Sequence, residues 1–180
     1  MNQALRAVAC AARAAACVLW AGAAFGADAC GEYKWDVSNE VRLFATAPTP
    51  LDAAATVQAA PSIATGTLYA LTLQPQEAIR YAAPPGKKQL ADGAYGGLLR
   101  LKVARAGAYR VAIDAAFWLD VVSDGRSLPA LDFNGQRQCA GPHKIVVYDL
   151  PAGVELTLQV AAASEDTARL TVTPVAAPGT

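Results

Sequence analysis

LRLKVARAGAYRVAIDAAFWLDV, residues 99–121, carries the clearest structural signal of the chain. Apolar side chains stand at every second position in three runs, 99–103, 109–113 and 117–121, with polar residues between them. A period of two places alternate side chains on opposite faces of an extended strand. Each run therefore predicts a strand with one face toward a core.

The same alternation continues on both sides of this segment. Further candidate strands cover residues 68–73, 78–82, 131–133, 145–147, 156–160 and 170–172. Turn residues separate them, and Asn134-Gly135 is a dipeptide suited to a tight hairpin. Eight or nine short alternating strands predict an all-β fold, an antiparallel β-sandwich of jelly-roll type.

Two segments precede these strands. Apolar residues at 33, 35 and 37 and then at 41 and 43 predict an opening strand or strand pair. Residues 46–66 are rich in Ala, Thr and Pro and predict a surface insertion, with one short helix expected over 52–60. Pro48, Pro50 and Pro61 argue against a central strand in that insertion. We expect residues 28–180 to form a single domain.

The first 27 residues resemble a cleaved signal peptide. Arg6 and Arg13 charge the leading part, and a 12-residue apolar run over 14–25 follows. That run suits a signal sequence and is shorter than the roughly 20 residues of a membrane span. Small residues place the cleavage between Gly26 and Ala29. The protein is thus predicted to be periplasmic or secreted, without a transmembrane segment after cleavage; an uncleaved anchor is the alternative.

Cleavage would remove two of the four cysteines and leave Cys30 and Cys139. In an oxidising compartment two cysteines most simply form one disulfide. A lipid on Cys30 is the rival interpretation, although the preceding Ala27-Asp28-Ala29 resembles a lipidation signal poorly. Past the leader, thirteen basic and fifteen acidic residues leave no basic stripe, so nucleic acid is not an expected partner.

The second half of the chain also resembles a known family. The segments Gly107-Ala108-Tyr109-Arg110-Val111, Asp124-Gly125 and Tyr148-Asp149-Leu150-Pro151-Ala152-Gly153 look like bacterial pre-peptidase C-terminal domains. The resemblance covers residues 98–174 and implies a secreted jelly-roll domain, some members of which bind calcium or polysaccharide. The start Cys30-Gly31-Glu32-Tyr33-Lys34-Trp35-Asp36-Val37 is similar to small secreted proteobacterial proteins.

Candidate metal ligands are few. His143 is the only histidine, and it lies four residues after Cys139, a pair whose sulfur and imidazole suit zinc or copper. The expected alternative is a disulfide followed by a turn. Asp120 and Asp124 imitate part of a calcium loop, and a calcium site at the sandwich edge could also use Asp132. An ordinary hairpin turn is the competing interpretation, and no other cofactor is expected.

Three functions remain open at this level. Gly86-Lys87-Lys88 does not fit a phosphate loop and is interpreted as a solvated turn. A secreted enzyme would need a pocket around His143, with Asp132, Tyr148 and Asp149. A carbohydrate-binding module would expose Tyr33, Trp35 or Trp118 for stacking on sugars, and the alternative places these aromatic side chains in the core. The preferred prediction is a non-catalytic binding module whose partner is an envelope protein or a polysaccharide.

Overall fold

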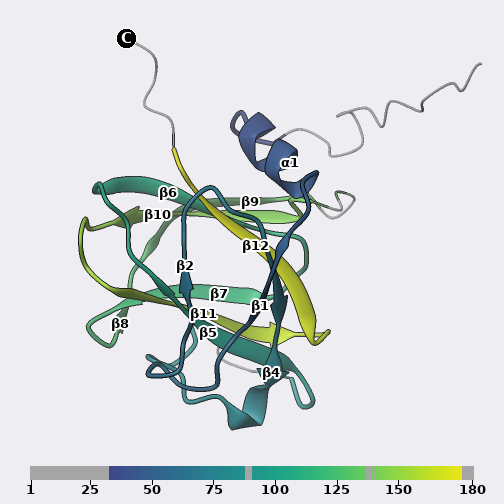
Figure 1. Cartoon of the computed structure of the whole chain (residues 1–180), viewed down its shortest axis with the longest axis vertical. Helices are drawn as coiled ribbons and strands as arrows, with labels where there is room; N and C mark the ends of the chain where they lie inside the picture. The colour runs from purple at the N-terminus through teal and green to yellow at the C-terminus, as the bar shows by residue number, and fades with distance from the viewer. Residues whose placement is uncertain (1–32, 88–90, 137–138, 140, 176–180) are drawn as a thin grey trace, which may run out of the picture.

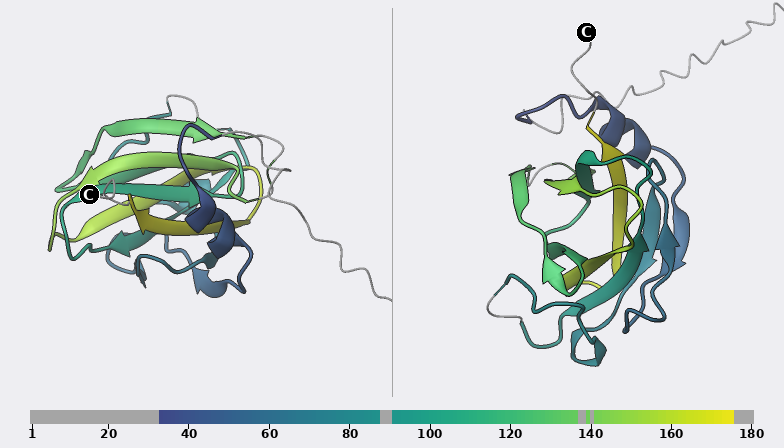
Figure 2. Two further views of the ribbon diagram at one scale, coloured as in Figure 1. Left: turned by 90° about the horizontal axis from the view of Figure 1, so that it is seen from above. Right: turned by 90° about the vertical axis from the view of Figure 1, so that its left-hand side faces the viewer.

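Two stacked β-sheets make up the computed structural model, which describes residues 33–87, 91–136, 139 and 141–175 (Figures 1 and 2). Sheet A has the order β1 (Thr49–Asp52), β3 (Tyr69–Thr72), β12 (Thr167–Pro174), β6 (Gly107–Ile113), β10 (Lys144–Leu150) and β9 (Ala130–Gly135). Sheet B has the order β2 (Ser62–Ile63), β5 (Tyr95–Leu101), β11 (Leu156–Ala163), β7 (Trp118–Ser123) and β8 (Arg126–Ser127), with β4 (Gln74–Pro75) also paired to β5. The helical elements are α1 (Ser38–Phe44) and the 3-10 turn η2 (Gln76–Ala78).

The all-β sandwich expected from the alternating pattern is confirmed. The runs at 99–103, 109–113 and 117–121 lie on β5, β6 and β7, and the runs at 156–160 and 170–172 lie on β11 and β12. The strands are not all antiparallel, because β1 pairs with β3 and β2 pairs with β5 in parallel. Both sheets are therefore mixed at one edge.

The main core lies between the sheets. Val111 and Ile113 of β6 face Leu99, Val121 and Leu158 of sheet B in one cluster of buried side chains. Burying an aliphatic side chain of this size stabilises the fold by about 1.5–3 kcal/mol. This core fixes the relative positions of the sheet edges, where the polar and aromatic side chains gather.

The outer face of sheet A is covered by residues 33–44, and the opening strand pair predicted there is wrong. Residues 33–37 are irregular, and α1 follows them above sheet A, on the side away from sheet B (Figure 1). Glu40 and Phe44 are one helical turn apart and both are buried, so the effective period is that of a helix. No helix in the part of the chain that the structure describes could cross a membrane.

This cover changes which side chains of β10 face the main core. The sequence pattern assigned Ile145 and Val147 to the inner face, and that assignment is wrong. Val146, Tyr148 and Leu150 point between the sheets, while Ile145 packs outward with Phe44. The strand is buried on both faces, so alternation of polarity could not fix its orientation.

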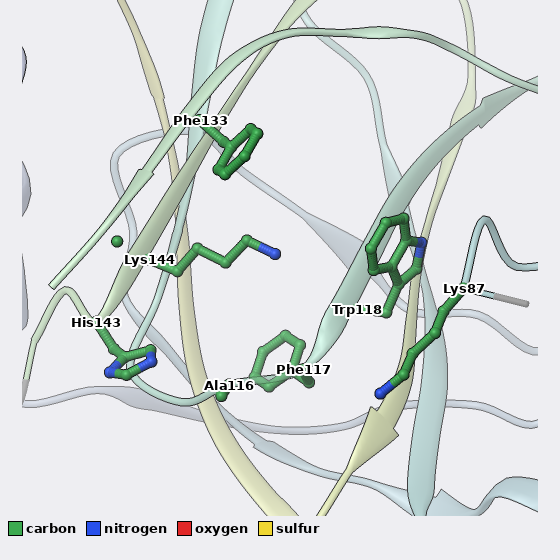
Figure 3. Close-up of a pocket in the computed structure, with 8 residues that line it drawn as sticks. Lys87, Ala116, Phe117, Trp118, Phe133, His143 and Lys144 are labelled. Atoms are coloured by element: carbon green, nitrogen blue, oxygen red, sulfur yellow. The ribbon is translucent and has the colours of Figure 1, made fainter. Parts of the chain in front are cut away.

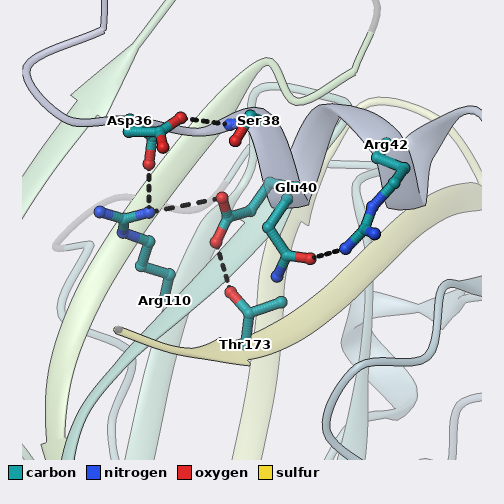
Figure 4. A network of polar contacts seen from close by, with 7 residues as sticks. Asp36, Ser38, Glu40, Arg42, Arg110 and Thr173 are labelled. Carbon is teal, nitrogen blue, oxygen red and sulfur yellow. Dashed lines mark hydrogen bonds and ion pairs between the residues drawn. The ribbon is translucent and has the colours of Figure 1, made fainter. Parts of the chain in front are cut away.

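A buried ion pair holds α1 to sheet A (Figure 4). Glu40 is only 1% exposed, and its Oε2 lies 3.4 Å from Nη1 of Arg110 on β6. Its Oε1 accepts a short hydrogen bond from the Thr173 hydroxyl of β12. Arg110 also donates to the Asp36 carbonyl at 2.6 Å and stacks on the Trp35 ring at 5.4 Å. One arginine thus ties the irregular segment, the helix and the sheet together.

Residues 46–66 contribute to the sandwich itself. They contain β1 and β2, which lie at the edges of sheet A and sheet B, and Ala53, Ala60 and Ile63 are buried. Pro50 lies in an edge strand, as its missing N–H requires. The helix expected over 52–60 does not form; turns and a single bridge from Ala54 to Leu98 occupy this stretch.

Two smaller predictions also differ from the structure. Residues 78–82 form no strand, because the 3-10 turn η2 and a loop occupy them. Asn134-Gly135 does not form the hairpin turn but ends β9, and the connection to β10 begins at residue 136. Gly135 pairs with Lys144 in the ladder, so the dipeptide lies within paired strands.

The free edge of sheet A is formed by β9. Asp132 and Asn134 pair with Val147 and Ile145 of β10, and the alternation of an antiparallel ladder directs the Phe133 N–H and C=O away from β10. The Asp132 carboxylate accepts the Phe133 N–H at 2.8 Å, and Lys34 Nζ donates to the Phe133 carbonyl at 3.3 Å. Lys34 and Asp132 also form an ion pair of 2.9 Å, so together they cover the centre of the edge.

Candidate functional site

A groove runs along the edge of the sandwich between β7 of sheet B and β9 and β10 of sheet A. It consists of two cavities of about 230 and 540 Å³ that share Trp118, Phe133 and Lys144 as lining residues. Leu128 and Ala130 line its inner end, where the chain crosses from β8 to β9. The mouth lies at the opposite end, where β7 begins and β9 ends.

Two aromatic side chains form the walls of the mouth. Trp118 projects from the first residue of β7, and Phe133 projects from β9 on the other sheet (Figure 3). Phe133 is 64% exposed, although large apolar side chains are usually buried. The Lys144 side chain lies between the two rings, with its ammonium nitrogen 5.5 Å from the centre of the Trp118 ring. The groove therefore presents aromatic faces and a cation together.

The indole is held in position by Asp120. Trp118 Nε1 donates to Asp120 Oδ1 at 3.0 Å, and Oδ2 accepts from the Gly86 N–H at 3.1 Å and from Gln159 Nε2 at 3.3 Å. Gln159 in turn is hydrogen-bonded to both backbone groups of Ala83. Asp120 is only 8% exposed, and these donors satisfy its carboxylate. The network fixes the orientation of the Trp118 ring and anchors the loop that carries Lys87.

The outer end of the groove is positively charged. Lys87, His143 and Lys144 line the larger cavity, and no acidic residue lines it among the described residues. Burial lowers the pKa of the Lys144 ammonium; the Asp120 carboxylate acts in the opposite direction and the Lys87 charge acts in the same one. Neither lysine takes part in an ion pair within the described ranges. Their charges are therefore free to meet a ligand.

Phe133, Lys144 and Lys87 were not predicted as site residues. Sequence analysis placed each of them in a strand or in a solvated turn, with no role in a site. A signal did exist for Phe133, because it is an aromatic residue beside the polar Asp132 and Asn134. Only the pairing of β9 with β10 and the contact between sheets bring these three side chains to Trp118.

Trp118 and Trp35 have different environments. Trp118 lies in the groove, as the stacking hypothesis requires. Trp35 and Tyr33 instead pack with Val37 against the cluster under α1, on the outer face of sheet A. The Tyr33 hydroxyl donates a short hydrogen bond to the Pro142 carbonyl, and burial raises its pKa to about 12. These two residues hold the N-terminal segment on the sheet and line no groove among the described residues.

The proposed metal ligands lie apart. Asp120 is buried and hydrogen-bonded, Asp124 lies in the exposed turn after β7, and Asp132 is paired with Lys34. No group of three side chains able to hold a metal ion occurs among the described residues. The calcium site using Asp120, Asp124 and Asp132 therefore has no support in their arrangement.

The catalytic set suggested around His143 is not brought together either. Tyr148 is buried between the sheets, where its hydroxyl donates to the Leu119 carbonyl at 2.9 Å, and the neighbouring Asp149 is exposed on the opposite face of β10. His143 lies five residues before Tyr148, about 16 Å along an extended strand. His143 contributes to the groove mouth instead.

Cys139 is buried, and it lies in the connection from β9 to β10. Cys30 and the leader lie outside the described residues, so the Cys30–Cys139 pairing and the signal peptide stay predictions. A disulfide at Cys139 would make its sulfur unavailable to a metal beside His143.

Comparison with protein-family models, with curated proteins and with solved structures finds no match to this chain. The resemblances to pre-peptidase C-terminal domains and to small secreted proteins therefore stay predictions. The geometry of the groove is therefore the evidence for function.

Proposed function

We propose that the protein is a non-catalytic binding module of the periplasm or cell exterior, and that its groove binds carbohydrate. The observation that carries this proposal is the pair of aromatic rings at the mouth, Trp118 held by Asp120 and Phe133 exposed on the facing strand. Aromatic faces combine a large apolar area with little conformational entropy to lose on binding. The C–H face of a sugar ring is a suitable partner for such a surface.

The position of the groove supports binding over catalysis. Ligand sites combine an apolar lining with a few polar groups that fix orientation, and the groove has both. The polar groups of the larger cavity are two ammonium groups and one imidazole, and no carboxylate of the described residues lines that cavity beside His143. Asp120 lines the smaller cavity, where its carboxylate is engaged by three donors. Export is supported separately by the leader pattern, and the disulfide predicted for Cys139 would persist in an oxidising compartment.

Fluorescence titration of the mature protein with soluble oligosaccharides tests the proposal. Trp118 and Trp35 are the tryptophans beyond the leader, so a Trp35→Phe background isolates the emission of Trp118. We expect a sugar that binds to change this emission, and we expect Phe133→Ala to weaken binding. Leu131→Ala is the matched control, because Leu131 is 59% exposed on the same strand but does not line the groove.

Equal loss of affinity in Phe133→Ala and Leu131→Ala would contradict a groove-specific site. If neither Phe133→Ala nor Leu131→Ala changes the affinity for sugars, but a substitution on another surface abolishes it, the site lies on that other surface. In both cases the groove would have to be abandoned as the functional surface.

A further inference from the structure

We propose that the groove selects acidic sugars, in which a carboxylate of the ligand is bound by Lys144 and Lys87 while the sugar ring packs against Phe133. This inference rests on the proposed function and specifies its ligand class. It is carried by the placement of the two lysines on opposite sides of the Trp118 ring at one mouth (Figure 3).

Lys144 is positioned as an anion-binding group. It is the first residue of β10 and is held by pairing to Gly135 on one side and to Ile113 on the other. The contact of its ammonium with the indole contributes only about 0.5–1 kcal/mol at an exposed site and satisfies none of its three N–H donors. Its three N–H donors meet no protein acceptor among the described residues, so a carboxylate would complete the site.

Lys87 brings the second charge from sheet B's side of the mouth. The loop that carries it is fixed by the hydrogen bond from Gly86 N–H to the Asp120 carboxylate. The repulsion between Lys87 and Lys144 contributes to the lowered pKa of Lys144. An anionic ligand would relieve this repulsion, whereas a neutral sugar would leave it unchanged.

Asp120 favours the charged form of Lys144, but its carboxylate is not open to a ligand at the mouth. It is almost fully buried and is engaged by three donors, the Trp118 indole, the Gly86 N–H and the Gln159 amide. It lines the smaller cavity and not the larger one, so the space that a ligand enters first is bounded by cations and aromatic rings. The charge pattern of the mouth is therefore complementary to a carboxylate.

Binding of an oligogalacturonide and of its methyl ester tests the inference, because the two ligands share their rings and differ in charge. We expect the acid to bind at least about tenfold more tightly, the effect of one charge-assisted hydrogen bond. Lys144→Met and Lys87→Met should each lower the ratio of acid to ester affinity toward one, because each removes a charge that only the acid can use. Lys102→Met, which removes an exposed lysine just after β5 that does not line the groove, is the control for net charge.

Each outcome decides between the two proposals. The proposal that the groove selects acidic sugars is overturned if the protein binds acid and ester equally. It is also overturned if Lys144→Met and Lys87→Met still prefer the acid. If both ligands bind equally and Phe133→Ala weakens both, the carbohydrate-binding groove stands without it. If neither ligand binds and a panel of neutral glucan and galactan oligosaccharides also fails, both proposals are overturned.

Discussion

Replacing Arg110 by methionine should destabilise the protein by about 3–5 kcal/mol, the usual cost of removing one partner of a buried ion pair. Methionine keeps most of the aliphatic volume, so the change isolates the charge. Glu40 would be left 1% exposed without its cation, 3.4 Å from the position the guanidinium now occupies. The hydrogen bond from Arg110 to the Asp36 carbonyl and the stacking on Trp35 would be lost as well.

A double-mutant cycle with Glu40→Gln separates the ion pair from these other contacts. Glutamine removes the charge and retains an acceptor for the Thr173 hydroxyl. The double variant should therefore be more stable than Arg110→Met alone, because no buried charge remains unpaired. Domains of this size are stable by about 5–15 kcal/mol, so the single variant should still fold for measurement.

Urea unfolding followed by far-ultraviolet circular dichroism gives the free energies for the four proteins of the cycle. A loss of less than about 1 kcal/mol in Arg110→Met would refute the reasoning, since it would fall in the range of exposed ion pairs. Additive losses in the double variant would equally show that Glu40 and Arg110 are not coupled.

Three further predictions concern tyrosines and the sheet edge. Tyr81→Phe should leave the free energy of unfolding in urea unchanged or slightly raised, because the buried Tyr81 hydroxyl has no hydrogen-bond partner among the described residues. Tyr148→Phe should instead lower it by about 1–3 kcal/mol, because the Leu119 carbonyl loses its hydrogen-bond donor. The free energy of unfolding should decline as the pH rises from 10 toward 12, because burial raises the pKa of Tyr81 to about 12 and the unfolded chain releases this proton first. Urea unfolding at pH 9 and at pH 11.5 should show a smaller decline in Tyr81→Phe than in the unsubstituted protein. Lys34→Ala should change the free energy of unfolding by less than about 1 kcal/mol but should promote self-association through β9. Sedimentation velocity would detect this association, with Lys102→Ala as the control. A Lys34→Ala protein that stays monomeric at all concentrations would count against the role of Lys34.

The sequence predicted the centre of the sandwich because its strands have one buried face. In β7 and β11, polar residues mark the side away from the core, and a period of two is enough to place them. β10 could not be oriented in this way, since Ile145 and Val146 are both buried. Its outward Ile145 is covered by Phe44 of α1, and sequence periodicity could not reveal this cover because the helix has seven residues and no side-chain cap.

Half of the groove was within reach of the sequence. Trp118 stands out of phase with Phe117 and Leu119, and this marked it as a side chain outside the main core. Phe133 could not be assigned to a face from the sequence, because β9 contains a bulge. Val147 and Tyr148 of β10 pair with Asp132 and Ala130, so Leu131 is the extra residue, and this bulge sets which side chains of β9 face sheet B. Such register depends on strand pairing and not on local sequence.

Trp118 and Phe133 belong to different sheets, so the groove lies where the two sheets meet at one edge of the sandwich. Two connections join the sheets beside it: residues 114–117 between β6 and β7, of which Ala116 and Phe117 line the larger cavity, and the corner at Leu128-Pro129 between β8 and β9. A ligand bound between the two rings would join the sheets at this edge a third time and oppose their local separation.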